Sequence, residues 1–99
     1  MLIVTGTVEL DAAKVEVMKT AATEMARATR QEPGCRVYAF WQDIERPNRF
    51  RVYEEWDDAA SLKAHGETAH MASFRAALAG AGVLSRDIYC FEPGPMTRL

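Results

Sequence analysis

The chain has 99 residues, with 12 Lys or Arg against 14 Asp or Glu and a formal net charge of −2. This near balance excludes the strongly basic surface of a typical nucleic-acid-binding domain. The hydrophobic content of 48% is that of a folded domain and excludes a disordered segment. We therefore expect a single small domain over residues 1–99, too short for separate cofactor and substrate lobes.

The sequence predicts a cytoplasmic protein with reduced thiols. No apolar run is long enough for a transmembrane helix. The first residues, 1–6, lack the basic segment and the long apolar stretch of a secretory signal. The two cysteines, Cys35 and Cys90, are too few for a disulfide scaffold.

The first part of the chain is expected to form a strand and then a long helix. Residues 2–10 alternate as a strand that buries one face. Asp11 follows as a helix cap, because its carboxylate can accept from the backbone N–H groups of the first turn. From residue 12 to about 31, the apolar residues at helical spacing are Val15, Met18, Ala22 and Met25. Glu32-Pro33-Gly34 ends this helix.

Residues 35–43 predict a second strand that is apolar on both faces, with Phe40 on one face and Trp41 on the other. A half-exposed strand should instead have one polar face. We therefore expect one face to be covered from outside this chain. A hairpin connection over residues 44–49 leads into a third strand over residues 50–56.

The last part of the chain predicts a broken helix and a fourth strand. A short helix over residues 59–65 is capped by Asp57-Asp58 and interrupted by Gly66. Thr68 caps a second segment, whose apolar residues at helical spacing are Met71, Phe74 and Leu78. The fourth strand is expected over residues 87–92.

The predicted order β-α-β-β-α-β is the split βαβ, or ferredoxin-like, arrangement. This α+β class has a four-stranded antiparallel sheet with helices on one face. Its second and fourth strands are edges, so Cys35 and Cys90 should lie too far apart for a disulfide. The other face of the sheet is left bare and partly apolar, which predicts a homodimer.

Strong cofactor or metal motifs are absent from the sequence. There is no P-loop and no dinucleotide fingerprint. His65 and His70 are five residues apart, which puts them on different faces of a continuous helix, whereas a two-histidine metal site on a helix requires a spacing of four. We therefore predict no metal and no cofactor.

A polar cluster is the remaining candidate for chemistry. Glu54 and Trp56 share one face at the end of the third strand, and His65, His70 and Arg75 follow nearby in the sequence. A carboxylate beside a histidine can orient the ring for general-base catalysis. Equally, Glu54 and His65 could form only a satisfied buried pair, with Trp56 as a core aromatic.

Five short motifs carry a family resemblance: Glu32-Pro33-Gly34-Cys35, Asn48-Arg49-Phe50, Glu54-x-Trp56, Leu62-x-x-His65 and His70-Met71-x-x-Phe74. In this order they resemble the antibiotic biosynthesis monooxygenase family over nearly the whole chain. The nearest branch is that of the bacterial quinol monooxygenases, through His65 and His70. The resemblance implies a ferredoxin-like dimer of the α/β-barrel type, with a pocket between sheet and helices. It also implies oxidation of a small quinol, phenolic or anthrone-type substrate by O₂ without metal, flavin or haem.

Carried onto this chain, the resemblance implies that His65 is the base and Glu54 its orienting partner. Trp56 would form a pocket wall, and His70 and Arg75 would contact substrate oxygens. The haem-degrading branch of the family is not indicated, because its key positions align with Thr7, His65 and Arg75.

Two alternatives remain open at this stage. A sugar-phosphate isomerase of the autoinducer-processing type shares the Glu54 and His65 positions. A non-catalytic dimer that binds a small molecule would keep the same pocket. The anthrone-oxygenase branch is weakened, because its pocket tyrosine aligns with Leu62.

Overall fold

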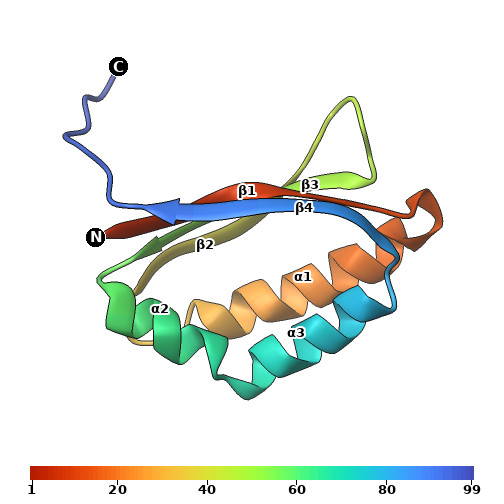
Figure 1. The fold of residues 1–99 in the computed structure, drawn as a ribbon, viewed down its shortest axis with the longest axis horizontal. Helices are drawn as coiled ribbons and strands as arrows, with labels where there is room; N and C mark the ends of the chain where they lie inside the picture. Colours follow the sequence, from red (N-terminus) through yellow and green to blue (C-terminus); the bar gives the residue numbers. More distant parts are fainter.

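One antiparallel sheet with all its helices on a single face makes up the fold, as the computed structural model of residues 1–99 shows (Figure 1). In chain order the elements are β1 (Leu2–Leu10), a 3₁₀ turn (Ala12–Lys14), α1 (Val15–Thr29), β2 (Cys35–Gln42), β3 (Arg49–Trp56), α2 (Ala59–Gly66), α3 (Ala69–Ala79) and β4 (Val83–Phe91). This confirms the predicted ferredoxin-like order. No helix in the fold is both long and apolar enough to span a bilayer.

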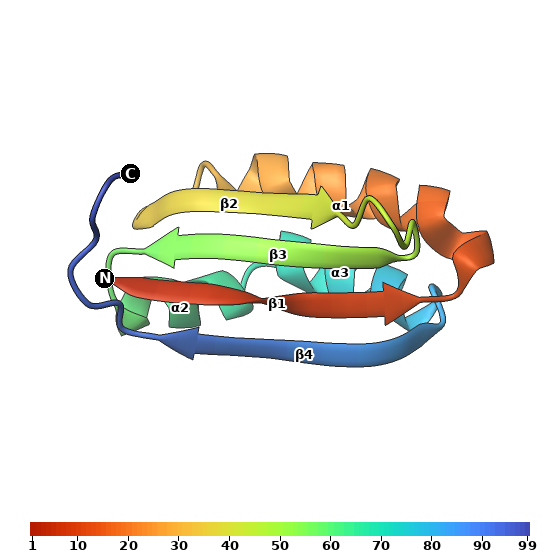
Figure 2. The same cartoon turned by 90° about the horizontal axis from the view of Figure 1, so that it is seen from above.

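The strands are arranged in the order β2-β3-β1-β4, so β2 and β4 are the edges (Figure 2). All neighbouring pairs are antiparallel. Cys35 and Cys90 lie on these opposite edge strands and are both free, as predicted.

Gly6 allows the central strand β1 to sit close to its neighbour β4. It pairs with Val52 on β3 and with Ile88 on β4. A Cβ at this position would collide with the backbone of Asp87 and Ile88. A residue with a side chain would therefore force the two strands apart, which explains the glycine in an otherwise regular strand.

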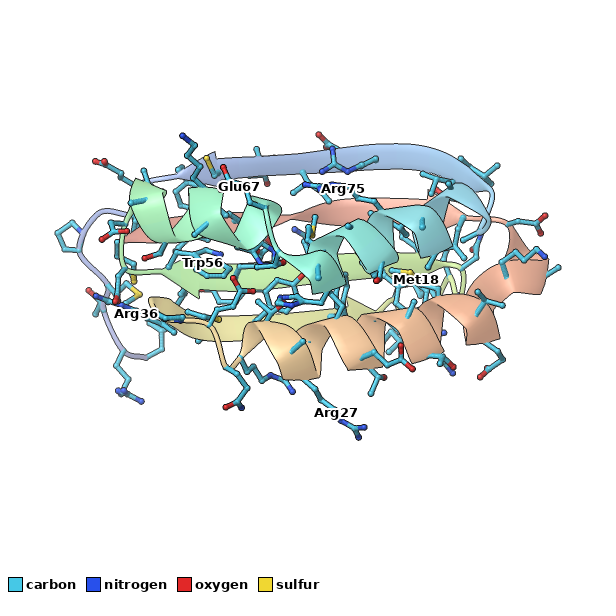
Figure 3. All side chains as sticks on the ribbon, turned by 90° about the horizontal axis from the view of Figure 1, so that it is seen from below. Met18, Arg27, Arg36, Trp56, Glu67 and Arg75 are labelled. Atoms are coloured by element: carbon cyan, nitrogen blue, oxygen red, sulfur yellow. The ribbon has the colours of Figure 1, made fainter.

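The core lies between the sheet and the helices, where the predicted apolar stripes meet. Met18, Ala22 and Met25 of α1 are buried against the inward face of the sheet, to which β1 contributes Val4, Val8 and Leu10. Figure 3 shows Met18 on the sheet-facing side of α1, whereas Arg27 points away from the core. The alternation of strand residues and the 3.6-residue period of the helix thus converge on one apolar layer.

The predicted helix caps are confirmed by their hydrogen bonds. Asp11 accepts from the backbone N–H of Ala13 at 2.9 Å. Asp58 accepts from the N–H of Ser61 at 2.8 Å, and Thr68 Oγ1 accepts from the N–H of Met71 at 3.2 Å. Each bond satisfies a donor that the first turn of a helix leaves without a backbone partner.

The predicted start of the fourth strand was wrong: β4 begins at Val83, four residues before the expected position. It pairs along β1 as far as Leu10, with a register shift next to Glu9. The backbone N–H of Asp11 also donates to the carbonyl of Gly82 at 2.9 Å. Backbone pairing, rather than side-chain alternation, therefore sets the beginning of this edge strand.

The face of the sheet away from the helices carries large apolar side chains. Trp41 on β2 is 63% exposed, and Tyr89 and Phe91 on β4 are 53% and 43% exposed. Tyr89 and Phe91 pair with Thr5 and Ile3, which point away from the helices. The chain after β4 rises on this helix-free side of the sheet (Figure 1).

Candidate functional site

A cavity of about 210 Å³ lies on the helix side of the sheet, between the strands and α2 and α3. Most of its lining is apolar, and the polar side chains in it are those of Glu54, His65, Tyr38 and Arg86. The full lining comprises Val4, Val8, Met18, Tyr38, Phe40, Val52, Glu54, Leu62, His65, Gly66, Met71, Phe74, Leu78, Arg86 and Ile88. An apolar hollow with a few convergent polar groups is the usual form of a small-molecule site.

Glu54 is a buried carboxyl group in this cavity, and 6% of the residue is exposed. Strand alternation on β3 directs it inward together with Phe50, Val52 and Trp56. Its Oε1 accepts a hydrogen bond from Trp56 Nε1 at 2.8 Å. Burial raises the pKa of Glu54 to about 7, against the opposing effect of the Trp56 bond and with a further raise from the Glu32 charge. Glu54 therefore exchanges its proton near neutral pH.

His65 is the second side chain of the cavity that can accept or donate a proton, and 4% of the residue is exposed. It lies in the last turn of α2, and its Nδ1 is 2.7 Å from Glu32 Oε2. An ionised carboxylate there accepts the Nδ1 proton, so the lone pair of the neutral ring lies on Nε2. In this tautomer Nε2 is the ring nitrogen that can accept a proton.

Glu32 connects His65 to His70. His70 Nε2 lies 2.7 Å from Glu32 Oε2, the same oxygen that contacts His65. The chain between Gly66 and Thr68 breaks the helix and turns it from α2 into α3. This break invalidates the expectation that a five-residue spacing separates the two rings, because that expectation assumed one continuous helix.

The turn before β2 brings Glu32 to the histidines. Gly34 has φ +83°, and a Cβ there would collide with the Ser61 side chain of α2. The carbonyl of Gly34 also accepts from the N–H of Asp57 at 2.9 Å. Only glycine combines this backbone conformation with such close packing, so the Pro33-Gly34 turn lies directly against α2.

Two predicted contacts of the site are corrected by the geometry. The carboxylate that orients His65 is Glu32, while Glu54 bonds to Trp56. Trp56 was expected to form a pocket wall, but it is completely buried and is not part of the cavity lining. Its ring lies 4.9 Å from that of His65 and its Nε1 bonds to Glu54, so Trp56 packs against both side chains from β3, where Figure 3 shows it.

His70 and Arg75, which were expected to contact substrate oxygens, are not among the residues that line the cavity. His70 borders a separate hollow between α1 and α3. Arg75 Nη2 donates to the carbonyl of Gly66 at 3.0 Å, which links α3 to the end of α2. Both residues therefore hold the α2–α3 junction together.

Sequence reasoning missed Glu32, Tyr38 and Arg86 as site residues. Glu32 was expected to end a helix and to belong to a family motif, but it was given no role in the site, and no periodicity relates it to residues more than thirty positions away. Tyr38 lines the cavity with its ring 5.5 Å from that of His65. Burial, together with the nearby Glu54 carboxylate, raises the pKa of Tyr38 far above its usual range, so its hydroxyl remains a donor. Strand alternation, which directs Tyr38 to the same face of β2 as Phe40, was the only sequence signal for this residue.

A larger hollow of about 420 Å³ lies between α1 and the β2 edge of the sheet and contains none of the candidate residues. Lys19, Arg27 and Arg30 line it beside Phe40 and Phe50. It is open to solvent, and its lining includes neither His65 nor Glu54, the two groups of the inner cavity that can exchange protons. We therefore place the candidate site in the smaller cavity.

Comparison with known proteins identifies the family. Residues 1–77 match the antibiotic biosynthesis monooxygenase family, to which this chain belongs. YcnE of Bacillus subtilis (strain 168), named provisionally as a monooxygenase, is 29% identical over 74 residues, which are 75% of this chain and 78% of YcnE. An uncharacterised protein of Synechocystis is 29% identical over 73 residues, 74% of this chain, and the match spans 50% of that longer protein.

Solved structures show the same fold. A structure from Deinococcus radiodurans, named provisionally as an antibiotic biosynthesis monooxygenase, superposes with a TM-score of 0.92 and 27% identity. The superposition covers 100% of this chain and 98% of that one. A provisionally named counterpart from Nitrosomonas europaea has a TM-score of 0.88 and 25% identity, over 94% and 98% of the two chains.

Proposed function

We propose that this protein is a monooxygenase that oxidises a small quinol or phenol with O₂, using electrons from the substrate itself. The observation that carries the proposal is the placement of His65 and Glu54 in one apolar cavity. A quinol anion is electron-rich enough to reduce O₂ once its proton has been removed. The protein therefore has to take that proton, exclude water and stabilise the oxygen that becomes charged.

The proposed reaction needs no external reductant. His65 Nε2 takes the proton of a quinol hydroxyl, and the anion gives two electrons to O₂ as a ring carbon forms a C–O bond. His65 returns its proton to the peroxide oxygen, which gives a hydroperoxide at a ring carbon that still carries hydrogen. The C–H and O–O bonds of this hydroperoxide then break together, so that the ring carbon becomes a carbonyl and water leaves. Quinol and O₂ thus give a hydroxyquinone and water, with one atom of O₂ in each product.

The residues around the cavity divide these tasks. Glu32 positions His65 through Nδ1. The Tyr38 hydroxyl and the Glu54 carboxyl, protonated in part near neutral pH, supply hydrogen bonds to the substrate oxygens. His70 holds Glu32, and Arg75 fixes the α2–α3 junction.

The size of the cavity favours a single-ring substrate. A cavity of about 150 Å³ in another protein accommodates benzene, so about 210 Å³ accommodates a ring with its hydroxyl groups and small substituents. A three-ring anthrone is a poor match for this volume. The lining also argues against a sugar phosphate, because Arg86 is its only cationic side chain besides the histidine.

The experiment is O₂ uptake by the purified full chain with a panel of substituted hydroquinones, in buffer containing EDTA. With ¹⁸O₂ as the gas, we expect one ¹⁸O atom in the hydroxyquinone and one in water. Formation of an unsubstituted quinone with H₂O₂ would instead indicate an oxidase. Saturable binding of the hydroquinones without O₂ uptake would favour the non-catalytic binding dimer.

We further propose that the protein is a homodimer formed through the helix-free face of the sheet. Trp41, Tyr89 and Phe91 expose large rings on this face, and an exposed apolar patch of this kind marks an interface. Light scattering at micromolar concentration should give twice the 11.1 kDa chain mass.

Trp41→Glu should shift this dimer towards monomer, because it places a charge in the interface. The matched control is Val17→Lys, which adds a charge to the exposed side of α1, where Val17 is 50% exposed. A monomeric wild-type protein, or equal dissociation in both variants, would contradict the proposal.

A further inference from the structure

We propose that Glu32, His65 and His70 form a binding site for one Zn²⁺ or a similar divalent transition-metal ion. The three ligand atoms, one carboxylate oxygen and two imidazole nitrogens, lie within 4.8 Å of one another. Two histidines and a glutamate are an established donor set for zinc and related metals. In this chain the set assembles from the turn after α1, the end of α2 and the start of α3.

The separations between the donor atoms suit a small rearrangement around an ion. Tetrahedral zinc with bonds of about 2.1 Å places its ligand atoms roughly 3.4 Å apart. The two nitrogen–oxygen contacts are now 2.7 Å, and all three atoms lie within 4.8 Å. To reach this geometry the two nitrogen–oxygen contacts must lengthen, and the two nitrogens, which are at most 4.8 Å apart, must lie roughly 3.4 Å apart.

Charge favours a cation at this position. The only ion-pair partners of Glu32 are the two imidazoles, and no Lys or Arg forms a salt bridge with it. When both rings are neutral, one negative charge therefore remains in a pocket where the Glu32 side chain is 11% exposed. A divalent ion compensates this charge and bonds all three groups at once. The His70 side chain is 27% exposed and leaves a path for entry.

Thr68 fixes the junction that holds the two rings together. Its hydroxyl donates to the carbonyl of His65 at 2.8 Å and accepts from the N–H of Met71 at 3.2 Å. A single side chain therefore bonds to the C-terminal end of α2 and caps the N-terminus of α3. The relative placement of His65 and His70 is therefore built into the backbone, which reduces the cost of organising them around an ion.

Metal binding has a consequence for catalysis, and this consequence rests on the proposed function. An ion bound at His65 Nδ1 moves the proton of the neutral ring to Nε2. Nε2 then donates into the cavity where it previously accepted. The metal-bound protein loses the proposed proton acceptor, so zinc should inhibit quinol oxidation.

Binding is measured by calorimetric titration of ZnCl₂ into the full chain after EDTA treatment and dialysis. We expect one ion per chain, and an affinity lowered at least roughly tenfold in Glu32→Gln and in His70→Asn. The matched control is Glu67→Gln, which removes an exposed carboxylate just beyond α2 (Figure 3) and should bind zinc like the wild type. Circular dichroism confirms that each variant is folded.

Co²⁺ provides a second readout on the same proteins, because its visible absorption reports coordination by nitrogen and oxygen ligands. Bands present in the wild type and absent in His70→Asn support the site. Absence of saturable binding, or equal zinc affinity in wild type, Glu32→Gln and His70→Asn, overturns it. Zinc binding that depends on these residues but leaves turnover unchanged supports the site and overturns the proposed role of His65 Nε2.

Discussion

Replacing His65 with alanine should lower the turnover of a hydroquinone by about a hundredfold or more, the usual scale for loss of a general base. The physical reason is that Nε2 of this ring is the proposed proton acceptor, and Glu32 holds the ring through its contact with Nδ1. Glu32→Gln should cause a smaller loss, since it removes the orienting charge and keeps the base. O₂ uptake in the presence of EDTA measures both effects independently of metal binding.

Lys63→Ala is the matched control for this series. Lys63 is an exposed residue of α2 two positions before His65, so its loss should change neither turnover nor folding. The melting temperature of each preparation separates a catalytic effect from a structural one. If His65→Ala lowers the melting temperature but retains normal turnover per folded molecule, His65 has no part in the reaction.

The Glu54 carboxyl should make the protein less stable as the pH rises. Below about pH 4.5 both the folded and the unfolded chain hold this proton. The unfolded chain releases it first, so the folded state loses relative stability until the pH passes about 7. At roughly 1.4 kcal/mol for each pKa unit, the total loss is about 3 kcal/mol.

Urea unfolding of the wild type and of Glu54→Gln at both ends of this range measures the loss. The free energy of unfolding of the wild type, relative to the variant, should decrease by about 3 kcal/mol between pH 4.5 and about pH 8. Val52→Ala is the control, because it truncates a buried neighbour on β3 that carries no titrating group. Its stability deficit should be equal at the two pH values, and a flat difference for Glu54→Gln would refute the buried-carboxyl assignment.

The position of Glu54 shows what local patterning can predict. Alternation along residues 50–56 places it on the buried face with Val52 and Trp56, and the structure has it there. The same pattern indicates a titratable group in an apolar layer, which is a signal of chemistry. Its hydrogen-bond partner was not predictable, because Trp56 and His65 are both within reach of a residue at that position and only packing decides between them.

The contact between Glu32 and His65 depends on the packing of elements that are distant in the sequence. Glu32 follows a helix and His65 ends another, and 33 positions separate them along the chain. Their contact depends on Gly34, whose backbone conformation and missing Cβ let the turn lie against Ser61. No periodicity encodes such a contact, since it arises from two elements docking rather than from one element's own pattern.

The sequence by itself determined which residues of a strand share a face, the helix caps at Asp11, Asp58 and Thr68, and the strand order. Alternation and capping are local rules, and the βαββαβ order of elements is a topological one, so none of them depends on how distant side chains pack. The tertiary structure alone decided that His65 and His70 meet on one carboxylate oxygen. A helical spacing rule predicts which side chains share a face only while the helix continues. Where the chain turns between Gly66 and Thr68, the packing of α2 and α3 sets that relation instead.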